Sequence, residues 1–432
     1  MSNTHREFYR YISMSILGML GSAGTILADT FFVSNRLGAN GLTALNIAIC
    51  IFGLINGLGL LLGVGGATYY AISKARGEDT KANEIFSISL FTSLGVGFIL
   101  FICGLFFSRP IVQILGAEGI ILPMADIYMK TILCFSPFFI LRHLCICFIQ
   151  NDDNPRLAMA AMLLGSMANI VLDYLFIYPL NMGIFGAAFA TALTPMVGVL
   201  ICSIHLFQKK NHFHLTKISA KRLEIRKICS FGTAAFINEC SSGIVLLVFN
   251  LLILNHAGNI GVAAYGIIAN LALIVMAVFT GISQGVQPLL SKAHGESDGA
   301  KIRIIYRHSI IMSAIIGLLV YIGSCHFAPE LVSIFNHEKN PDLQMIAETG
   351  LQIYFVSFLF LGYNFLSASR FSATEKPLIA FTLSFFRGCV GVIAVAVIFA
   401  YLWSIDGIWL SIPVVEFLTL LMGICFSVRA AL

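Results

Sequence analysis

The sequence predicts an all-α polytopic membrane protein in which twelve transmembrane helices form two parallel six-helix repeats. Three observations lead to this fold class: 58% of the 432 residues are hydrophobic, only 11% are charged, and apolar stretches of membrane-spanning length recur along the whole chain. A soluble protein averages about 25% charged residues. So few charges cannot cover a water-exposed surface, and most of this surface must therefore face lipid.

Each predicted span is long enough to cross about 30 Å of hydrocarbon as a helix. The connections between spans are short, except for the basic stretch 208–228. We therefore expect a first lobe at residues 1–207, a basic cytoplasmic linker at 208–228 and a second lobe at 229–432. The predicted spans are 11–34, 46–73, 85–107, 121–149, 157–179, 184–207, 229–254, 262–290, 306–326, 346–371, 378–400 and 407–428.

The distribution of Lys and Arg predicts the orientation of these spans. Of the 26 Lys and Arg residues, 20 lie on one side of the predicted membrane and 3 on the other. Because cytoplasmic loops carry the excess of these residues, both termini and the linker are expected in the cytoplasm. The positive charge is dispersed through the connecting segments, so no nucleic-acid partner is expected.

The two halves of the sequence repeat each other at a nearly constant offset. Residues 73–78, SKARGE, recur as 291–296, SKAHGE, and Pro155 recurs as Pro377. Since each half has an even number of spans, the second copy enters the membrane in the same orientation as the first, which makes the repeats parallel. Two such bundles with a cleft between them are a transporter architecture.

Polar residues inside the predicted spans of the first half form the strongest candidate site. An ionisable side chain at the centre of a membrane helix costs at least about 2.5–3.5 kcal/mol, which makes each one a candidate for function. Asn169 and Asp173 lie one turn apart on one helical face. Asp29 supplies a second carboxylate and Thr191 a hydroxyl. This set suits a bound Na⁺ and equally suits a shared proton; the alternative is that Asn169 and Asp173 only join neighbouring helices.

The second half offers Glu239, Glu416 and Gln284 as candidates for binding a proton or substrate. A glutamate inside the bilayer can act as a proton carrier, or it can be hydrogen-bonded into the bundle with a purely structural role. Arg142 and Arg387 also lie in or near spans and can pair with the intramembrane carboxylates. The sequence leaves open which arginine pairs with which acid.

Nothing in the sequence favours catalysis or a cofactor. Residues 281–285, GISQG, fit the pattern of a nucleophile elbow, but they lie in the middle of an apolar span rather than at a strand-to-helix turn. The sequence has no P-loop and no H-E-x-x-H metal motif. Its 11 cysteines are scattered through apolar stretches without the spacing of a disulfide or metal framework. We therefore expect neither an enzyme nor a resident cofactor.

Taken together, the motifs resemble the multidrug and toxin extrusion (MATE) family and, within it, the MepA-like bacterial branch. The resemblance covers nearly the whole chain and implies two six-helix lobes around a V-shaped cleft. It also implies a cation site at Asp29, Asn169, Asp173 and Thr191 and a functional glutamate at Glu239. The aspartate in span ten that some members use with that glutamate has no equivalent here. The matching motifs are Ala28-Asp29-Thr30, the glycine-rich second span ending in 73–78, residues 169–173, residues 183–188, and Gly407-Ile408-Trp409 with Pro413 and Glu416.

The resemblance also implies a function. We expect an H⁺- or Na⁺-coupled multidrug efflux antiporter that exports cationic lipophilic drugs by alternating access, as a monomer in the lipid bilayer of a bacterial inner membrane. The alternative is a flippase or exporter of a lipid-linked or metabolite substrate from the same superfamily. Acids outnumber bases in the predicted spans, which favours cationic cargo. The sequence does not distinguish H⁺ from Na⁺ as the coupling ion.

Overall fold

The structure, a computed structural model, describes residues 3–209, 211–218, 222–336 and 339–431, and throughout these residues the regular structure is helical, as predicted. Inside hydrocarbon no water is present to bond the backbone, and a helix satisfies its own N–H and C=O groups. The first half contains α1 (Asn3–Ala75), α2 (Asp79–Ile114), α3 (Ile121–Cys134), α4 (Ser136–Asn151), α5 (Pro155–Ile177) and α6 (Gly183–Phe207). The second half contains α7 (Arg222–Gly295), α8 (Gly299–His326), α9 (Ala328–Ser333), α10 (Pro341–Phe355), α11 (Phe358–Ala373), α12 (Pro377–Phe385), the π-helical η1 (Phe386–Val390) and α13 (Gly391–Ala431).

Glycines at equivalent positions of the repeat break the two longest helices. Gly38 within α1 has φ +65°, and Gly258 within α7 has φ +60°. Glycine adopts this conformation readily because it has no Cβ. Without the break, the 74 residues of α7 would form a rod about 110 Å long, several times the hydrocarbon thickness. Each break therefore converts one long helix into two membrane crossings.

The number of crossings agrees with the prediction. Eight helical stretches are long and apolar enough to span a membrane, and the bent pairs α3–α4 (47°) and α10–α11 (43°) raise that number to ten. The break at Gly258 and a non-helical step at Trp403 and Ser404 each divide one of these stretches, which gives twelve within the described residues. Several helices continue past their predicted ends, because charged residues with high helix propensity extend them beyond the hydrocarbon. Helix α7, for example, begins at Arg222 rather than at 229.

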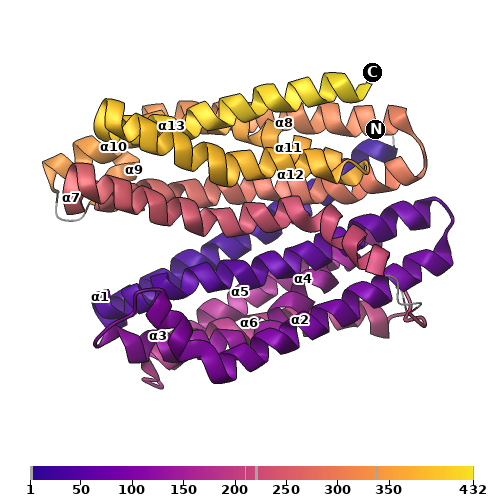
Figure 1. The fold of residues 1–432 in the computed structure, drawn as a ribbon, viewed down its shortest axis with the longest axis horizontal. Helices are drawn as coiled ribbons and strands as arrows, with labels where there is room; N and C mark the ends of the chain where they lie inside the picture. Colours follow the sequence, from indigo (N-terminus) through magenta and orange to yellow (C-terminus); the bar gives the residue numbers. More distant parts are fainter. Residues whose placement is uncertain (1–2, 210, 219–221, 337–338, 432) are drawn as a thin grey trace.

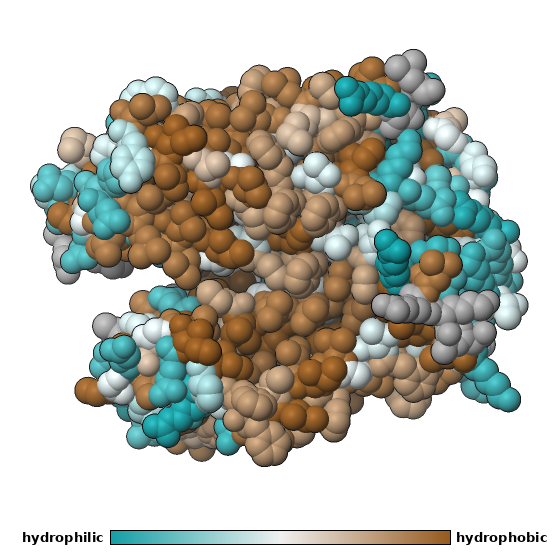
Figure 2. All heavy atoms as spheres, in the orientation of Figure 1, coloured by the Kyte–Doolittle hydropathy of each residue, from teal (hydrophilic) through white to brown (hydrophobic). Residues whose placement is uncertain are grey.

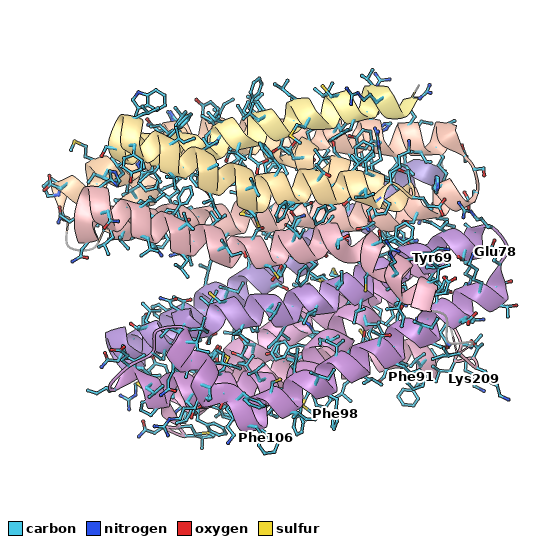
Figure 3. All side chains as sticks on the ribbon, viewed as in Figure 1. Tyr69, Glu78, Phe91, Phe98, Phe106 and Lys209 are labelled. Carbon is cyan, nitrogen blue, oxygen red and sulfur yellow. The ribbon has the colours of Figure 1, made fainter. Side chains whose placement is uncertain are left out.

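The two halves of the chain enclose a cleft. Figure 1 shows most of the second half above the first, with both termini at one end of the molecule. Figure 2 shows that the cleft is open at the opposite end, and that hydrophobic residues cover the middle of the molecule while hydrophilic ones gather at its ends. Along α2, Phe91, Phe98 and Phe106 point outward (Figure 3) and are 54%, 59% and 72% exposed, as expected of side chains that face lipid. We call the end that carries both termini the terminal face.

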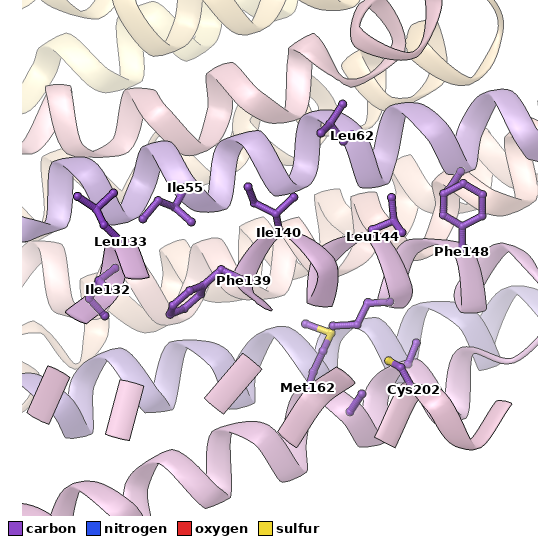
Figure 4. Close-up of a cluster of buried hydrophobic side chains, with 14 of the residues drawn as sticks. Ile55, Leu62, Ile132, Leu133, Phe139, Ile140, Leu144, Phe148, Met162 and Cys202 are labelled. Atoms are coloured by element: carbon purple, nitrogen blue, oxygen red, sulfur yellow. The ribbon is translucent and has the colours of Figure 1, made fainter. Parts of the chain in front are cut away.

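Each half has its own hydrophobic core, but the beginnings of α1 and α7 cross into the opposite half. Figure 4 shows part of the first core, built from α1, α3, α4, α5 and α6. Phe8, Tyr11 and Ile12 of α1 are buried in the second core, whereas Ile228 and Phe231 of α7 are buried in the first. The boundaries of the two cores therefore differ from the lobe boundaries at 207 and 229 that the sequence suggests.

Glycines let the crossing helices pack backbone to backbone. Gly65 of α1 lies against the Ile228 carbonyl, and Gly232 of α7 lies against the Leu61 carbonyl. At the equivalent crossing, Gly285 of α7 faces the backbone of the start of α1. A Cβ at these positions would collide with main-chain atoms, which cannot rotate away as a side chain can. Direct helix–helix contact therefore closes the cleft toward the terminal face.

Two ion pairs also join the halves at the terminal face. Arg76, just after α1, contacts Glu375 with Nη2 and Oε2 at 2.5 Å, and Nζ of Lys292 lies 3.4 Å from Oδ1 of Asp153. The hydrogen bond from Arg76 lowers the pKa of Glu375, so this pair is charged at neutral pH and is lost only as pH falls through the lowered value. Exposed pairs contribute about 0.2–1 kcal/mol each, so both reinforce a closure that rests mainly on packing.

Residues 211–218, between α6 and α7, run without regular structure over the terminal end of the first half. Phe213 is buried there, with its ring centroid 5.9 Å from that of Phe148. Oδ2 of the buried Asp152 accepts a hydrogen bond from the His212 backbone N–H at 2.9 Å. Oδ1 of Asp152 lies 3.0 Å from Nδ1 of the His212 ring. The segment therefore packs against the first half through His212 and Phe213.

Candidate functional site

Four helices bring polar residues of the first half into one buried cluster. Asp29 is on α1, Asn169 and Asp173 are on α5, Thr191 is on α6, and α3 adds Tyr128. Asn169 and Asp173 are completely buried, and Asp29 is 9% exposed. The structure therefore brings together all four residues that the sequence suggests for a cation site.

Asn169 links this cluster by hydrogen bonds. With its amide nitrogen turned toward Asp173, Asn169 donates to Oδ2 of that carboxylate at 3.2 Å. Its amide oxygen then accepts from the Thr191 backbone N–H at 3.3 Å and from the Thr194 hydroxyl at 3.2 Å. These three bonds join α5 to α6 and hold the Asn169 amide against the Asp173 carboxylate.

Asp29 is the neighbouring carboxylate of Asp173 in the cluster. The Tyr128 hydroxyl donates to Oδ2 of Asp29 at 3.5 Å. One oxygen of each carboxylate, Oδ1, is buried and has no hydrogen-bond partner within the described part of the chain. Two buried carboxylates with unsatisfied oxygens repel each other unless a positive charge accompanies them. The geometry of the cluster therefore suits one bound proton or small cation.

Two residues of this cluster, Tyr128 and Thr194, have no place in the sequence-based site. Tyr128 carries a usable signal, because a phenol hydroxyl buried in an apolar span usually finds a hydrogen-bond partner. Thr194 carries none, because its hydroxyl also bonds the Ala190 carbonyl of its own helix at 3.1 Å, as threonines in helices often do.

In the second half, the structure pairs Glu416 of α13 with Arg387 of η1. Nη2 of Arg387 lies 2.6 Å and Nε 3.1 Å from Oε1 of Glu416, and the two side chains are buried. Asn364 of α11 donates to Oε2 of Glu416 at 2.6 Å, and Asn238 of α7 accepts from Nη1 of Arg387 at 3.2 Å. The pairing of Arg387 that the sequence leaves open is thus resolved. Unlike the two aspartates, Glu416 already has a cation beside it.

The other predicted residues of the second half lie apart from this ion pair. Glu239 of α7 is half-buried, and its electrostatic neighbour is Arg142 of α4, which belongs to the first half. Neither of these two forms an ion pair within the residues that the structure describes. Gln284 lies at the crossing of α1 and α7, where its backbone carbonyl accepts from Nε2 of Gln150 at 3.4 Å.

Replacing Glu416 by Met is expected to destabilise the protein by about 3–5 kcal/mol, because the guanidinium of Arg387 stays buried without a countercharge. Thermal unfolding of the purified protein in detergent measures this loss. The double variant Arg387→Met/Glu416→Met removes both charges and should regain most of the stability. If the double variant is as unstable as the sum of its single variants, the two side chains are not energetically coupled and the prediction is wrong.

Known proteins resemble this chain along most of its length. The MatE family model matches residues 14–175 and 234–402. A multidrug export protein MepA from Staphylococcus saprophyticus is 26% identical over 414 residues, which are 95% of this chain and 91% of the relative. The protein of the same name from Staphylococcus haemolyticus is 27% identical over 435 residues, covering 98% and 94%.

Solved structures share the same fold. An outward-facing multidrug resistance MATE family transporter of the MOP superfamily has a TM-score of 0.92 at 23% identity, covering 99% of this chain and 96% of that one. A MOP superfamily transporter from Pyrococcus furiosus also gives 0.92, at 24% identity and the same coverage. These two structures show the fold of this chain, and the family model and the staphylococcal export proteins mark the chain as a membrane transporter and not an enzyme, as the sequence predicts. The matched family model covers most of the chain, which belongs to the MatE family; the MATE resemblance of its motifs is confirmed.

Proposed function

We propose that this transporter is a multidrug efflux antiporter that binds H⁺ or Na⁺ at Asp29, Asn169, Asp173 and Thr191. The observation that carries the proposal is the pair of buried Oδ1 atoms, one on each aspartate, without hydrogen-bond partners. A proton shared by the two carboxylates, or a Na⁺ held by their oxygens, supplies what these atoms lack.

The position of Asp29 supports a coupling route. Asp29 is on α1, whose first turns cross into the second half. Binding of a cation removes the repulsion between α1 and α5 and so favours one arrangement of α1 over another. Because the start of α1 also packs against α7 at the closed end of the cleft, the same cation shifts the equilibrium between the two faces of the transporter.

The cargo and the orientation complete the proposal. The staphylococcal relatives are multidrug export proteins, and half-buried Glu239 offers a negative charge for lipophilic cations. The bacterial relatives favour a bacterial inner membrane, and the 20 to 3 distribution of Lys and Arg favours an orientation with both termini in the cytoplasm. The cleft then opens to the outside. A monomer suffices, since one chain supplies both sides of the cleft.

Efflux of ethidium from proteoliposomes tests this proposal. An inward Na⁺ gradient at constant pH is compared with an inward H⁺ gradient without Na⁺. Transport driven by one gradient and absent from protein-free liposomes is the expected result, and it identifies the coupling ion. Absence of transport under both gradients would contradict the proposal and favour an exporter of a lipid-linked or metabolite substrate.

A further inference from the structure

A cavity of about 390 Å³ lies at the terminal face of the second half, between the beginnings of α8 and α12 and the ends of α11 and α13. Three cationic side chains line it, Arg303, Arg370 and Lys376, and so does His294 at the end of α7, whose Nε2 lies 3.1 Å from Oε2 of Glu375. Tyr306 and Phe371 add aromatic surface. None of its described lining residues is acidic, so the cavity concentrates positive charge.

The equivalent place in the first half is filled by the chain itself. At the offset of 222 that relates Pro155 to Pro377, Arg370 corresponds to Phe148 and Thr374 to Asp152. In the first half, Phe148 packs against Phe213, and Asp152 binds the residue before Phe213. The described residues include no such segment over the second half, where the aromatic and the acid are replaced by an arginine and a threonine. The three cationic side chains around this uncovered cavity favour an anionic ligand.

Arg370 is held in a fixed orientation. Its guanidinium lies over the ring of Tyr306 at 4.5 Å and over that of Phe371 at 4.7 Å, and Nη2 donates to the Ser427 hydroxyl at 3.2 Å. No ion pair with a carboxylate occupies it within the described part of the chain. A stacked guanidinium presents a planar fork of N–H donors, which matches the oxygens of a phosphate group.

The cavity also borders the lipid-facing surface. Ile304 follows Arg303, Val428 follows Ser427, and Leu378 lies two residues after Lys376; these three apolar side chains are 44%, 59% and 76% exposed. A ligand in the cavity therefore meets positive charge on one side and hydrocarbon on the other. Basic pockets between transmembrane helices at this depth suit phosphate headgroups of lipids.

We propose that this cavity binds the phosphate-bearing headgroup of an anionic phospholipid. Arg303, Arg370 and Lys376 hold the phosphate, and the acyl chains run along the exposed apolar side chains beside the cavity. A soluble phosphate compound shares the headgroup chemistry but leaves that apolar border unused. The site is separate from the cation cluster of the first half, and the proposal does not depend on the coupling ion or the cargo.

Native mass spectrometry of the full chain in detergent tests the proposal, with titrations of phosphatidylglycerol, phosphatidylcholine and inorganic phosphate. Phosphatidylglycerol is expected to bind more tightly than the other two. The double variant Arg303→Gln/Lys376→Gln should weaken its binding about thirtyfold, since each basic residue near a membrane surface contributes about fivefold. The matched control Lys301→Gln/Arg307→Gln removes the same charge from α8, outside the cavity, and should retain the binding of the unmodified protein.

The substituted residues of the test variant are exposed, so the variant is expected to fold. If both double variants weaken phosphatidylglycerol binding equally, the weakening reflects the loss of positive charge in general, and the proposed site is wrong. Binding of phosphatidylcholine as tight as that of phosphatidylglycerol would also overturn it. If inorganic phosphate binds as tightly and displaces phosphatidylglycerol, the ligand comes from solution and the lipid assignment is wrong.

Discussion

Replacing Asp173 by Asn is expected to reduce ion-driven drug efflux in proteoliposomes to the level of protein-free liposomes. Asn has the shape of Asp and can still bond Asn169, so the helix packing around this buried position is retained. The variant lacks the second negative charge, so no repulsion remains between α5 and Asp29 of α1 for a cation to relieve. The same protein should therefore still bind drug but no longer respond to the gradient.

The matched control for this variant is Asp406→Asn, which removes an exposed carboxylate of the second half beside the non-helical step at Trp403 and Ser404. It should leave efflux unchanged. Membrane level and thermal unfolding should be the same in both variants. Full efflux in Asp173→Asn would exclude this carboxylate from ion coupling, and a misfolded Asp173→Asn would assign it a structural role instead.

Replacing Gly232 by Val is expected to abolish efflux by a different route. The new side chain collides with the Leu61 carbonyl at the crossing of α1 and α7. Overpacking of this kind costs about 1–3 kcal/mol or more, and here the cost falls on the arrangement in which the terminal end of the cleft is closed. The halves should then separate at the terminal face.

Spin labels at Glu78 and Glu296 can measure this separation. These exposed residues are equivalent in the repeat and lie on opposite halves. The distance between the labels should increase in Gly232→Val. Gly243→Val is the matched control, because a Cβ at Gly243 of the same helix meets no atom within 4 Å. An unchanged distance in Gly232→Val would mean that the crossing does not hold the terminal end closed.

Some features of this protein can be predicted from its sequence, and others cannot. The crossings could be predicted because hydropathy over a span of helix is a one-dimensional property. The pairing of Asn169 with Asp173 could be predicted because both lie on one face of one helix. The pairing of Arg387 with Glu416 could not, since it joins two separate helices and Arg387 lies in a π-helical turn, where the regular helical period no longer gives the direction of a side chain.

The crossed beginnings of α1 and α7 could not be predicted either. Hydropathy identifies these segments as membrane helices but says nothing of which bundle their apolar faces contact. Gly65 and Gly232 indicate close approach only once the opposing carbonyls are known, because glycines are common in membrane helices. The sequence repeat predicts that the residues of each half form the core of that half. The starts of α1 and α7 depart from this rule because each packs in the core of the opposite half.

The same exchange sets an order of events during synthesis. Phe8, Tyr11 and Ile12 leave the ribosome first, yet the core that buries them includes Trp409 and Val415 from the end of the chain. The start of α7, by contrast, packs in the core of the first half, which has already been synthesised. Translation must therefore continue through α7 and into α8 before the start of α1 reaches its final packing. Each half synthesised alone would lack part of its core, and two separately expressed halves should regain it only by assembling with each other.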